Sequence, residues 1–168
     1  TTKPTLELSK MLWADSLKIA AQEGEIPPYN QTHIAATEAS TIGTHFRKPI
    51  DITKNARLEF FDAGHILGSA MVKVDVKNKT FVYSGDFMVP PIRLHNGAEI
   101  KKIGKVDYLM MESTYGNRVH PDREKVIHEF VAKIRETLDR GGHCVIAAFA
   151  IGRSQEILDI LFEYGVDA

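Results

Sequence analysis

The sequence predicts a mixed α/β protein. Segments with an apolar repeat near 3.6 residues occur beside segments in which every second residue is apolar, and turn residues separate them. The chain has 168 residues, of which 43% are hydrophobic and 26% are charged. This composition is ordinary for a soluble protein, and the length suffices to bury roughly 70% of the unfolded surface.

No membrane segment is predicted, because no apolar run approaches the roughly 20 residues that span a bilayer. No charged region followed by an apolar stretch opens the chain, so we expect a cytoplasmic protein without a membrane partner. The single cysteine, Cys144, excludes an intramolecular disulfide and a cysteine-rich zinc site.

Two helices are expected in the N-terminal part. The first runs from Thr5, which can cap it, to about Glu23, and Gly24 ends it. Its expected apolar face consists of Leu8, Met11, Leu12 and Ile19. Residues 27–28 are both proline and break the chain, and a shorter helix follows over residues 32–41.

The middle of the chain predicts strands. Four segments, at 50–52, 57–61, 71–76 and 81–83, are predicted as strands, and apolar residues alternate over most of the first three. The last two of these form a predicted hairpin around a turn at 77–79. After a predicted loop at 87–105, the apolar residues 106–111 are typical of a central strand covered on both faces.

The C-terminal part predicts a helix, a strand and a second helix. The first helix covers residues 121–140, because Pro121 suits its first turn and Gly141 ends it. Its apolar stripe consists of Val126, Ile127, Phe130, Val131, Ile134 and Leu138. Residues 143–149 predict a buried strand that contains Cys144, and the last helix is expected from Gly152 to about Tyr164.

His65 and Asp86 are candidate metal ligands. His65 lies in a glycine-containing loop before the predicted hairpin, and Asp86 follows Gly85 directly after it. If the two strands pair in register, both residues lie at the same end of the sheet. Imidazole and carboxylate groups suit zinc, but a zinc site needs at least three protein ligands. The other interpretation is that His65 is a turn residue and Asp86 closes an Asx turn. His33, His45, His95 and His128 are interpreted as surface or packing residues.

Two further positions have two interpretations each. Glu112 ends a predicted strand and can either cap the next turn or orient a metal-bound group from outside the ligand set. Arg153 and Ser154 open a predicted helix behind Gly152, where free N–H groups favour a phosphate. Alternatively, Ser154 caps that helix and Arg153 pairs with a nearby carboxylate.

Four sequence motifs resemble one protein family. DAGHILGSA at 62–70, YSGDF at 83–87, MESTYGNR at 111–118 and FAIGRSQEIL at 149–158 occur in the order seen in the β-CASP branch of the metallo-β-lactamase superfamily. The likeness is greatest to the nuclease subunit of the cleavage and polyadenylation specificity factor and its archaeal relatives. It implies an α/β fold that is part of a metallo-β-lactamase αββα sandwich, with residues 1–148 in that domain and 149–168 beginning the β-CASP domain.

The resemblance also implies an activity and its residues. It implies a zinc-dependent ribonuclease of messenger-RNA 3′-end processing or RNA decay, with two zinc ions about 3.5–4 Å apart. Asp86 would bridge the ions, His65 would bind one of them, and Glu112 would belong to the active site. The family's HxHxDH run, which supplies most ligands, does not occur in these residues. We therefore expect a fragment that is inactive and binds zinc poorly by itself.

RNA is the expected partner, although the net charge of −1 argues against a general nucleic-acid binder. A partial sandwich exposes strand edges, so we expect either a homo-oligomer or a second chain that supplies the missing ligands. A non-catalytic scaffold subunit of an RNA-processing complex is the alternative function. A DNA-directed or small-molecule hydrolase on the same fold is the third.

Overall fold

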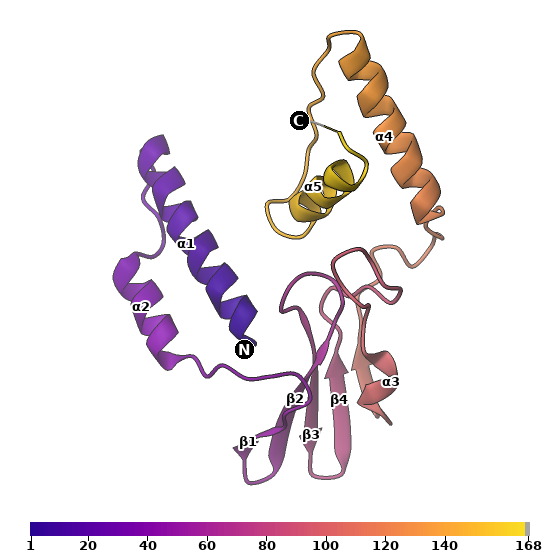
Figure 1. Cartoon of the computed structure of the whole chain (residues 1–168). Helices are drawn as coiled ribbons and strands as arrows, with labels where there is room; N and C mark the ends of the chain where they lie inside the picture. Colours follow the sequence, from indigo (N-terminus) through magenta and orange to yellow (C-terminus); the bar gives the residue numbers. More distant parts are fainter. Residues whose placement is uncertain (167–168) are drawn as a thin grey trace. The chain divides into compact units, whose positions relative to one another are not determined.

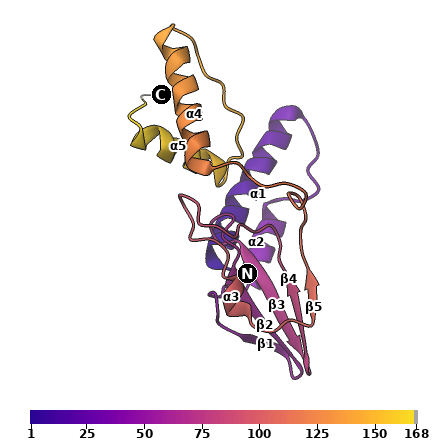
Figure 2. The ribbon, with the colours of Figure 1, turned by 90° about the vertical axis from the view of Figure 1, so that its right-hand side faces the viewer.

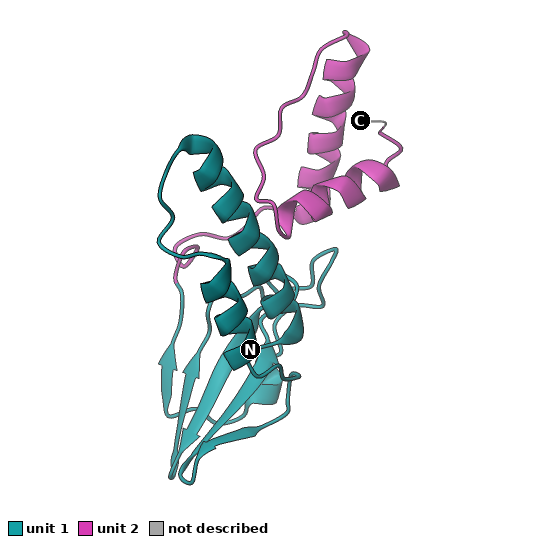
Figure 3. Cartoon of the chain, turned by 90° about the vertical axis from the view of Figure 1, so that its left-hand side faces the viewer, with its two compact units in different colours: residues 1–112 teal, residues 113–168 magenta. Residues whose placement is uncertain are grey.

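The structure is a computed structural model that describes residues 1–166, and it consists of two compact units, Thr1–Glu112 and Ser113–Ala168 (Figure 3). The first unit holds a sheet and helices and the second holds helices, so the predicted α/β class is confirmed. The predicted boundary between residues 148 and 149 refers to the domains of a longer enzyme and stays a prediction. Residues 167 and 168, which end that predicted segment, lie outside the described residues.

The first unit is organised around a five-stranded sheet whose strands lie side by side in chain order (Figures 1 and 2). The strands are β1 Ile50–Thr53, β2 Ala56–Asp62, β3 Ala70–Val76, β4 Lys79–Tyr83 and β5 Tyr108–Met110. The pairs β1–β2, β2–β3 and β3–β4 are antiparallel, and β5 runs parallel to β4. The predicted hairpin, formed by β3 and β4, is therefore confirmed.

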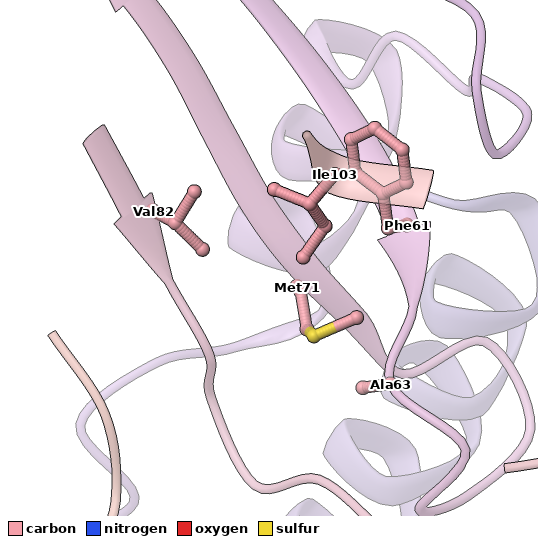
Figure 4. Packing of buried hydrophobic residues seen from close by; sticks show 5 residues of the cluster. All are labelled: Phe61, Ala63, Met71, Val82 and Ile103. Atoms are coloured by element: carbon pink, nitrogen blue, oxygen red, sulfur yellow. The ribbon is translucent and has the colours of Figure 1, made fainter. Parts of the chain in front are cut away.

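One face of the sheet carries the core of the first unit. Phe61 and Met71 are cross-strand partners, and Val82 and Ala63 lie on the same side. A short helix, α3 Ile100–Ile103, adds Ile103 to this cluster (Figure 4). The segment 87–105 was predicted as loop throughout, and α3 is the exception: a single turn buries Ile103 against the sheet.

Helix α1 covers Lys3–Glu23 and begins earlier than predicted, because Thr2 rather than Thr5 caps it. The hydroxyl of Thr2 accepts from the Thr5 backbone N–H and donates to the Gly68 carbonyl at 2.8 Å. This bond attaches the start of α1 to the β2–β3 loop. Gly24, at φ 72°, ends the helix as predicted.

The predicted apolar face of α1 is wrong at three positions. Met11, Leu12 and Ile19 are exposed, whereas Trp13 is half-buried. Trp13 lines a groove of about 480 Å³ that β1 and β2 share with α1. Because the start of α1 is fixed by Thr2, the helix turns the indole toward the sheet, and periodicity alone does not reveal that rotation.

Helix α2 covers Gln31–Ser40 and is capped by Asn30. The Asn30 side chain accepts from the backbone N–H groups of Thr32 and His33. In return, Nδ1 of His33 accepts from the Asn30 N–H at 3.3 Å. His33 is exposed, so its interpretation as a surface residue is confirmed, and its ring has a capping contact.

Two of the predicted strands differ from expectation, the first in its surroundings and the second in its existence. Residues 106–111 were expected as a covered central strand, but β5 is short, lies at the edge of the sheet and has exposed side chains. Residues 143–149 were expected as a buried strand, but they form no regular structure and Cys144 is exposed. Among residues 1–166, β4 is the one strand that pairs with β5, and the segment 143–149 pairs with none.

The second unit contains two helices, α4 Arg123–Asp139 and α5 Arg153–Glu163. Both predicted helices are confirmed. Asp122 caps α4 by accepting from the Lys125 N–H at 2.9 Å. Ile127, Val131 and Ile160 form the core of this unit, and the first two belong to the predicted stripe. No helix in the described part of the chain has the length and apolar character to cross a bilayer.

Candidate functional site

The loop between β2 and β3 carries His65 and is fixed by backbone hydrogen bonds. The hydroxyl of Ser69 accepts from the N–H of His65 and of Ile66, each at 3.2 Å. The Asp62 carboxylate accepts from the Gly64 N–H at 2.7 Å. His65 itself is exposed. The loop therefore holds the His65 backbone in place while its imidazole faces solvent.

Gly64 allows this loop to pack against another segment of the same unit. Its φ is 65°, and a Cβ atom there would lie 2.4 Å from the carbonyl carbon of Gly97. A side chain would therefore have to displace backbone, so glycine is required at this position. The close approach fixes the loop that carries His65 against the chain that follows β4.

The segment that carries Asp86 is attached to the same loop. The Met88 N–H donates to the Ala63 carbonyl at 2.9 Å, and the Ser84 N–H donates to the Met110 carbonyl at 3.0 Å. Gly85 has a φ of 55° and turns the chain out of β4. Asp86 is exposed, as His65 is.

Glu112 contacts the segment that carries Asp86. Its Oε1 atom accepts from the Phe87 N–H at 3.0 Å, and its own N–H donates to the Ser84 hydroxyl at 3.2 Å. The first interpretation of Glu112 expected its carboxylate to cap the turn that directly follows it. The carboxylate instead holds the backbone beside Asp86, 25 residues earlier in the chain.

Glu99 fixes the other side of the His65 loop. Its N–H donates to the Asp62 carbonyl at 2.9 Å, and its carboxylate accepts from the Asp62 N–H at 3.4 Å. Burial alone raises the pKa of Glu99. Hydrogen bonds from Lys102 and the Asp62 N–H, with the nearby Arg47 charge, outweigh burial and hold that pKa below its usual value.

These contacts bring the candidate residues to one end of the sheet. In the register of the hairpin, Val72 faces Tyr83, so the loop before β3 and the segment after β4 lie at the same edge. The predicted common end is therefore confirmed. Whether the two side chains share a metal ion stays a prediction.

His and Asp are suitable zinc ligands, but two exposed ligands do not complete a site. In residues 1–166, no group of three or more His, Cys, Asp or Glu side chains is arranged to hold a metal ion. The donor set therefore fits part of a zinc site.

Arg153 and Ser154 lie in the second unit, at the start of α5. Nη1 of Arg153 donates to the Glu156 carboxylate at 2.9 Å, and Arg123 from α4 donates to the same carboxylate. The Ser154 hydroxyl donates to the Phe149 carbonyl at 2.7 Å and does not cap the helix. Arg153 therefore pairs with a nearby carboxylate, as the alternative interpretation expected. Its contact with a phosphate stays a prediction.

Glu156 is a buried, paired carboxylate that the sequence interpretation missed. It is 4% exposed and accepts from arginines on both helices of the second unit. An arginine three residues before a glutamate on a helix signals one of these pairs. The contribution of Arg123, 33 residues away, has no sequence signal.

Comparison with known proteins gives archaeal relatives over the whole chain. The chain is 41% identical to Probable RNase MJ4 of Methanocaldococcus jannaschii, over 100% of the chain and 40% of the relative. It is 38% identical to transcription termination factor FttA of Methanothermobacter thermautotrophicus, over 97% of the chain and 26% of the relative. It is 32% identical to RNase aCSPSF2 of Saccharolobus solfataricus, and this match covers 96% of the chain and 32% of the relative.

The chain is a homologue of these archaeal proteins. The resemblance to archaeal relatives that the four motifs predicted is therefore confirmed. The chain spans between about a quarter and two fifths of the length of these three relatives. No family profile matches the chain.

Proposed function

We propose that the chain is part of a zinc-dependent β-CASP ribonuclease that hydrolyses RNA phosphodiester bonds in 3′-end processing or RNA decay. The observation that carries the proposal is the attachment of the His65 loop to the Asp86 segment through Met88 and Ala63, at 2.9 Å. The names of two homologues, which call them RNases, support the same activity.

His65 and Asp86 are the proposed metal ligands, and Asp86 is the ligand that two ions would share. Zinc bound there would lower the pKa of a water molecule toward about 7 and so provide a nucleophile near neutral pH. Glu112 acts as a positioning residue. By accepting from the Phe87 N–H, it fixes the backbone next to Asp86 and limits where the Asp86 carboxylate can lie.

Arg153 and Ser154 are the proposed phosphate contacts. One Arg153 N–H is used by Glu156, but the side chain is half-exposed and the guanidinium has five N–H donors. The Ser154 hydroxyl donates its proton to the Phe149 carbonyl, so it can donate to a phosphate only after the O–H rotates away from that carbonyl.

These 168 residues alone are proposed to bind zinc weakly and to be inactive, because they offer two of the ligands. A second chain would supply the remaining ligands, whereas self-association would cover exposed strand edges without adding them. A zinc titration against a chromophoric chelator checks this, with an expected dissociation constant weaker than about 1 µM. The His65→Ala variant should weaken that binding further, whereas His45→Ala, which removes another exposed imidazole, should leave it unchanged.

A chimaera tests the activity. These residues would replace the matched 40% of Probable RNase MJ4, and zinc-dependent cleavage of single-stranded RNA would be compared with that of the parent. We expect cleavage in the chimaera and at least about a 1,000-fold loss on Asp86→Ala, with His45→Ala as the control. If the parent cleaves and the chimaera folds but does not, the nuclease proposal is wrong and the scaffold alternative holds.

A further inference from the structure

The segment that follows Glu112 contains a cluster of three side chains suited to nucleic-acid binding. The ring centroids of Tyr115 and His120 are 4.6 Å apart with planes at 58°. The Arg118 guanidinium carbon lies 5.1 Å from the Tyr115 ring centroid. These three residues are called the Tyr115 cluster below, and all of them belong to the second unit.

Local turns assemble the Tyr115 cluster. The Gly116 N–H donates to the Ser113 carbonyl at 3.0 Å, and the Arg118 N–H donates to the Tyr115 carbonyl at 3.3 Å. These two bonds bend the chain, so that side chains three and five positions apart meet on one ring. The contacts that assemble the cluster therefore lie within residues 113–120.

The charge of this segment differs from that of the whole chain. Residues 113–121 contain an arginine and a histidine but no Asp or Glu, although the chain as a whole carries a net charge of −1. Several other arginines pair with carboxylates, as Arg57 does with Asp51 and Arg123 does with Glu156. The recorded side-chain contact of Arg118 is the Tyr115 ring, and its guanidinium is exposed.

We propose that the Tyr115 cluster binds one nucleotide of a single-stranded RNA, with the base stacked on Tyr115 and the adjoining phosphate on Arg118. Tyr115 is 53% exposed, so part of its ring is accessible to a base. Stacking on an exposed aromatic ring is the usual way in which proteins bind unpaired bases, and a guanidinium can contact a phosphate with two parallel N–H bonds. His120 packs on Tyr115 and limits the rotation of its ring.

This inference rests on the proposed ribonuclease function and adds a substrate contact to it. Tyr115 follows Glu112, the proposed positioning residue, by three residues in the chain. A nucleotide on Tyr115 would belong to the RNA strand on which the enzyme acts. The binding itself needs no metal, so it can be measured while hydrolysis is blocked.

Fluorescence anisotropy with a labelled oligouridylate, in the presence of a chelator, measures the binding. Tyr115→Ala should weaken RNA binding by about 10-fold, whereas Tyr115→Phe, which keeps the ring, should retain it within about 2-fold. Arg118→Ala should weaken binding. It should also reduce the magnitude of the slope of log K against log salt concentration by about 1, the value expected for one lost phosphate contact. Phe162→Ala is the matched control, because Phe162 is an exposed ring of the same unit.

The outcomes separate this inference from the proposed function. If RNA binds and Tyr115→Ala has the same effect as Phe162→Ala, the cluster is a packing feature and the inference is overturned, while the nuclease proposal stands. Absence of binding at about 100 µM, the weak end of non-specific affinity, also overturns it. Helix content by circular dichroism confirms that each variant is folded.

Discussion

Two apolar runs of this chain have the same β-forming character and different structures. Residues 80–83 form most of β4, and Val82 in that strand is 4% exposed. Residues 143–149 were also predicted as a strand, yet they form no regular structure, and Val145 is 98% exposed. Apolar, β-branched residues therefore become a strand where partner strands exist, because strand propensity is largely cross-strand packing.

The partners of β4 are identifiable. It pairs with β3 through a tight turn, in which Lys77 takes a φ of 54°. It pairs with β5 on its other side, and the Asp107 carboxylate accepts from the Thr80 N–H at 2.9 Å at the start of that pairing. The segment 143–149 has no such neighbour among the described residues.

The largest expected difference between the two runs is in amide hydrogen exchange. The amides of residues 81–83 should exchange about 1,000-fold more slowly than in an unfolded chain, because their exposure requires the sheet to open. The amides of residues 144–148 should exchange within about 10-fold of the unfolded rate. Exchange followed by NMR measures both. Protection of residues 144–148 equal to that of β4 would mean that this run pairs with another strand. The proposed difference between the two runs would then be wrong.

A matched pair of substitutions gives the next largest effect. Val82→Ala removes two methyl groups from the core of the first unit and should lower the free energy of unfolding by about 2–3 kcal/mol. Val145→Ala removes the same atoms from a side chain in solvent and should change it by less than about 0.5 kcal/mol. Urea unfolding followed by circular dichroism measures both variants.

Trp13, the one tryptophan, lies in the first unit and reports on that unit separately by fluorescence. The Val82→Ala effect should appear in this signal. Equal effects of the two valine substitutions would show that residues 143–149 are packed in solution.

The smallest expected effect concerns Asp107. The Thr80 N–H, and next the Lys79 ammonium, lower the pKa of Asp107 below its usual value. Its contribution to stability is therefore present above the unfolded pKa of about 3.9 and is lost as the pH falls through the lower folded pKa. Urea unfolding of Asp107→Asn should differ from that of the parent at neutral pH, and the difference should shrink below about pH 4. A difference that stays constant to pH 2 would exclude this role.

Local contacts explain which predictions succeeded. Helix α4 follows from its own residues, because Asp122 caps it and Ile127 and Val131 repeat at helical spacing. The hairpin of β3 and β4 follows from alternation and a short turn. Each of these signals lies within a few residues of the element it predicts, so a single sequence suffices to detect it.

Distant contacts explain which predictions failed. The rotation of α1 depends on the bond from Thr2 to Gly68, 66 residues away. The Glu112 carboxylate accepts from the Phe87 N–H, 25 residues earlier in the chain. Glu156 accepts from Arg123, which lies on the other helix of its unit. Tyr115 and Arg118 meet through local contacts, and the absence of acidic residues at 113–121 is visible in the sequence.

Short-range patterns and ordered motifs were sufficient to predict the α/β class, the positions of four of the helices, the β3–β4 hairpin and the family relationship. The three-dimensional fold was needed to show which face of α1 is buried and whether an apolar run becomes a strand. It also decided that the Glu112 carboxylate fixes the backbone beside Asp86. Each of these depends on a partner that is brought near by folding, and the free energy of such a contact is absent from the local sequence.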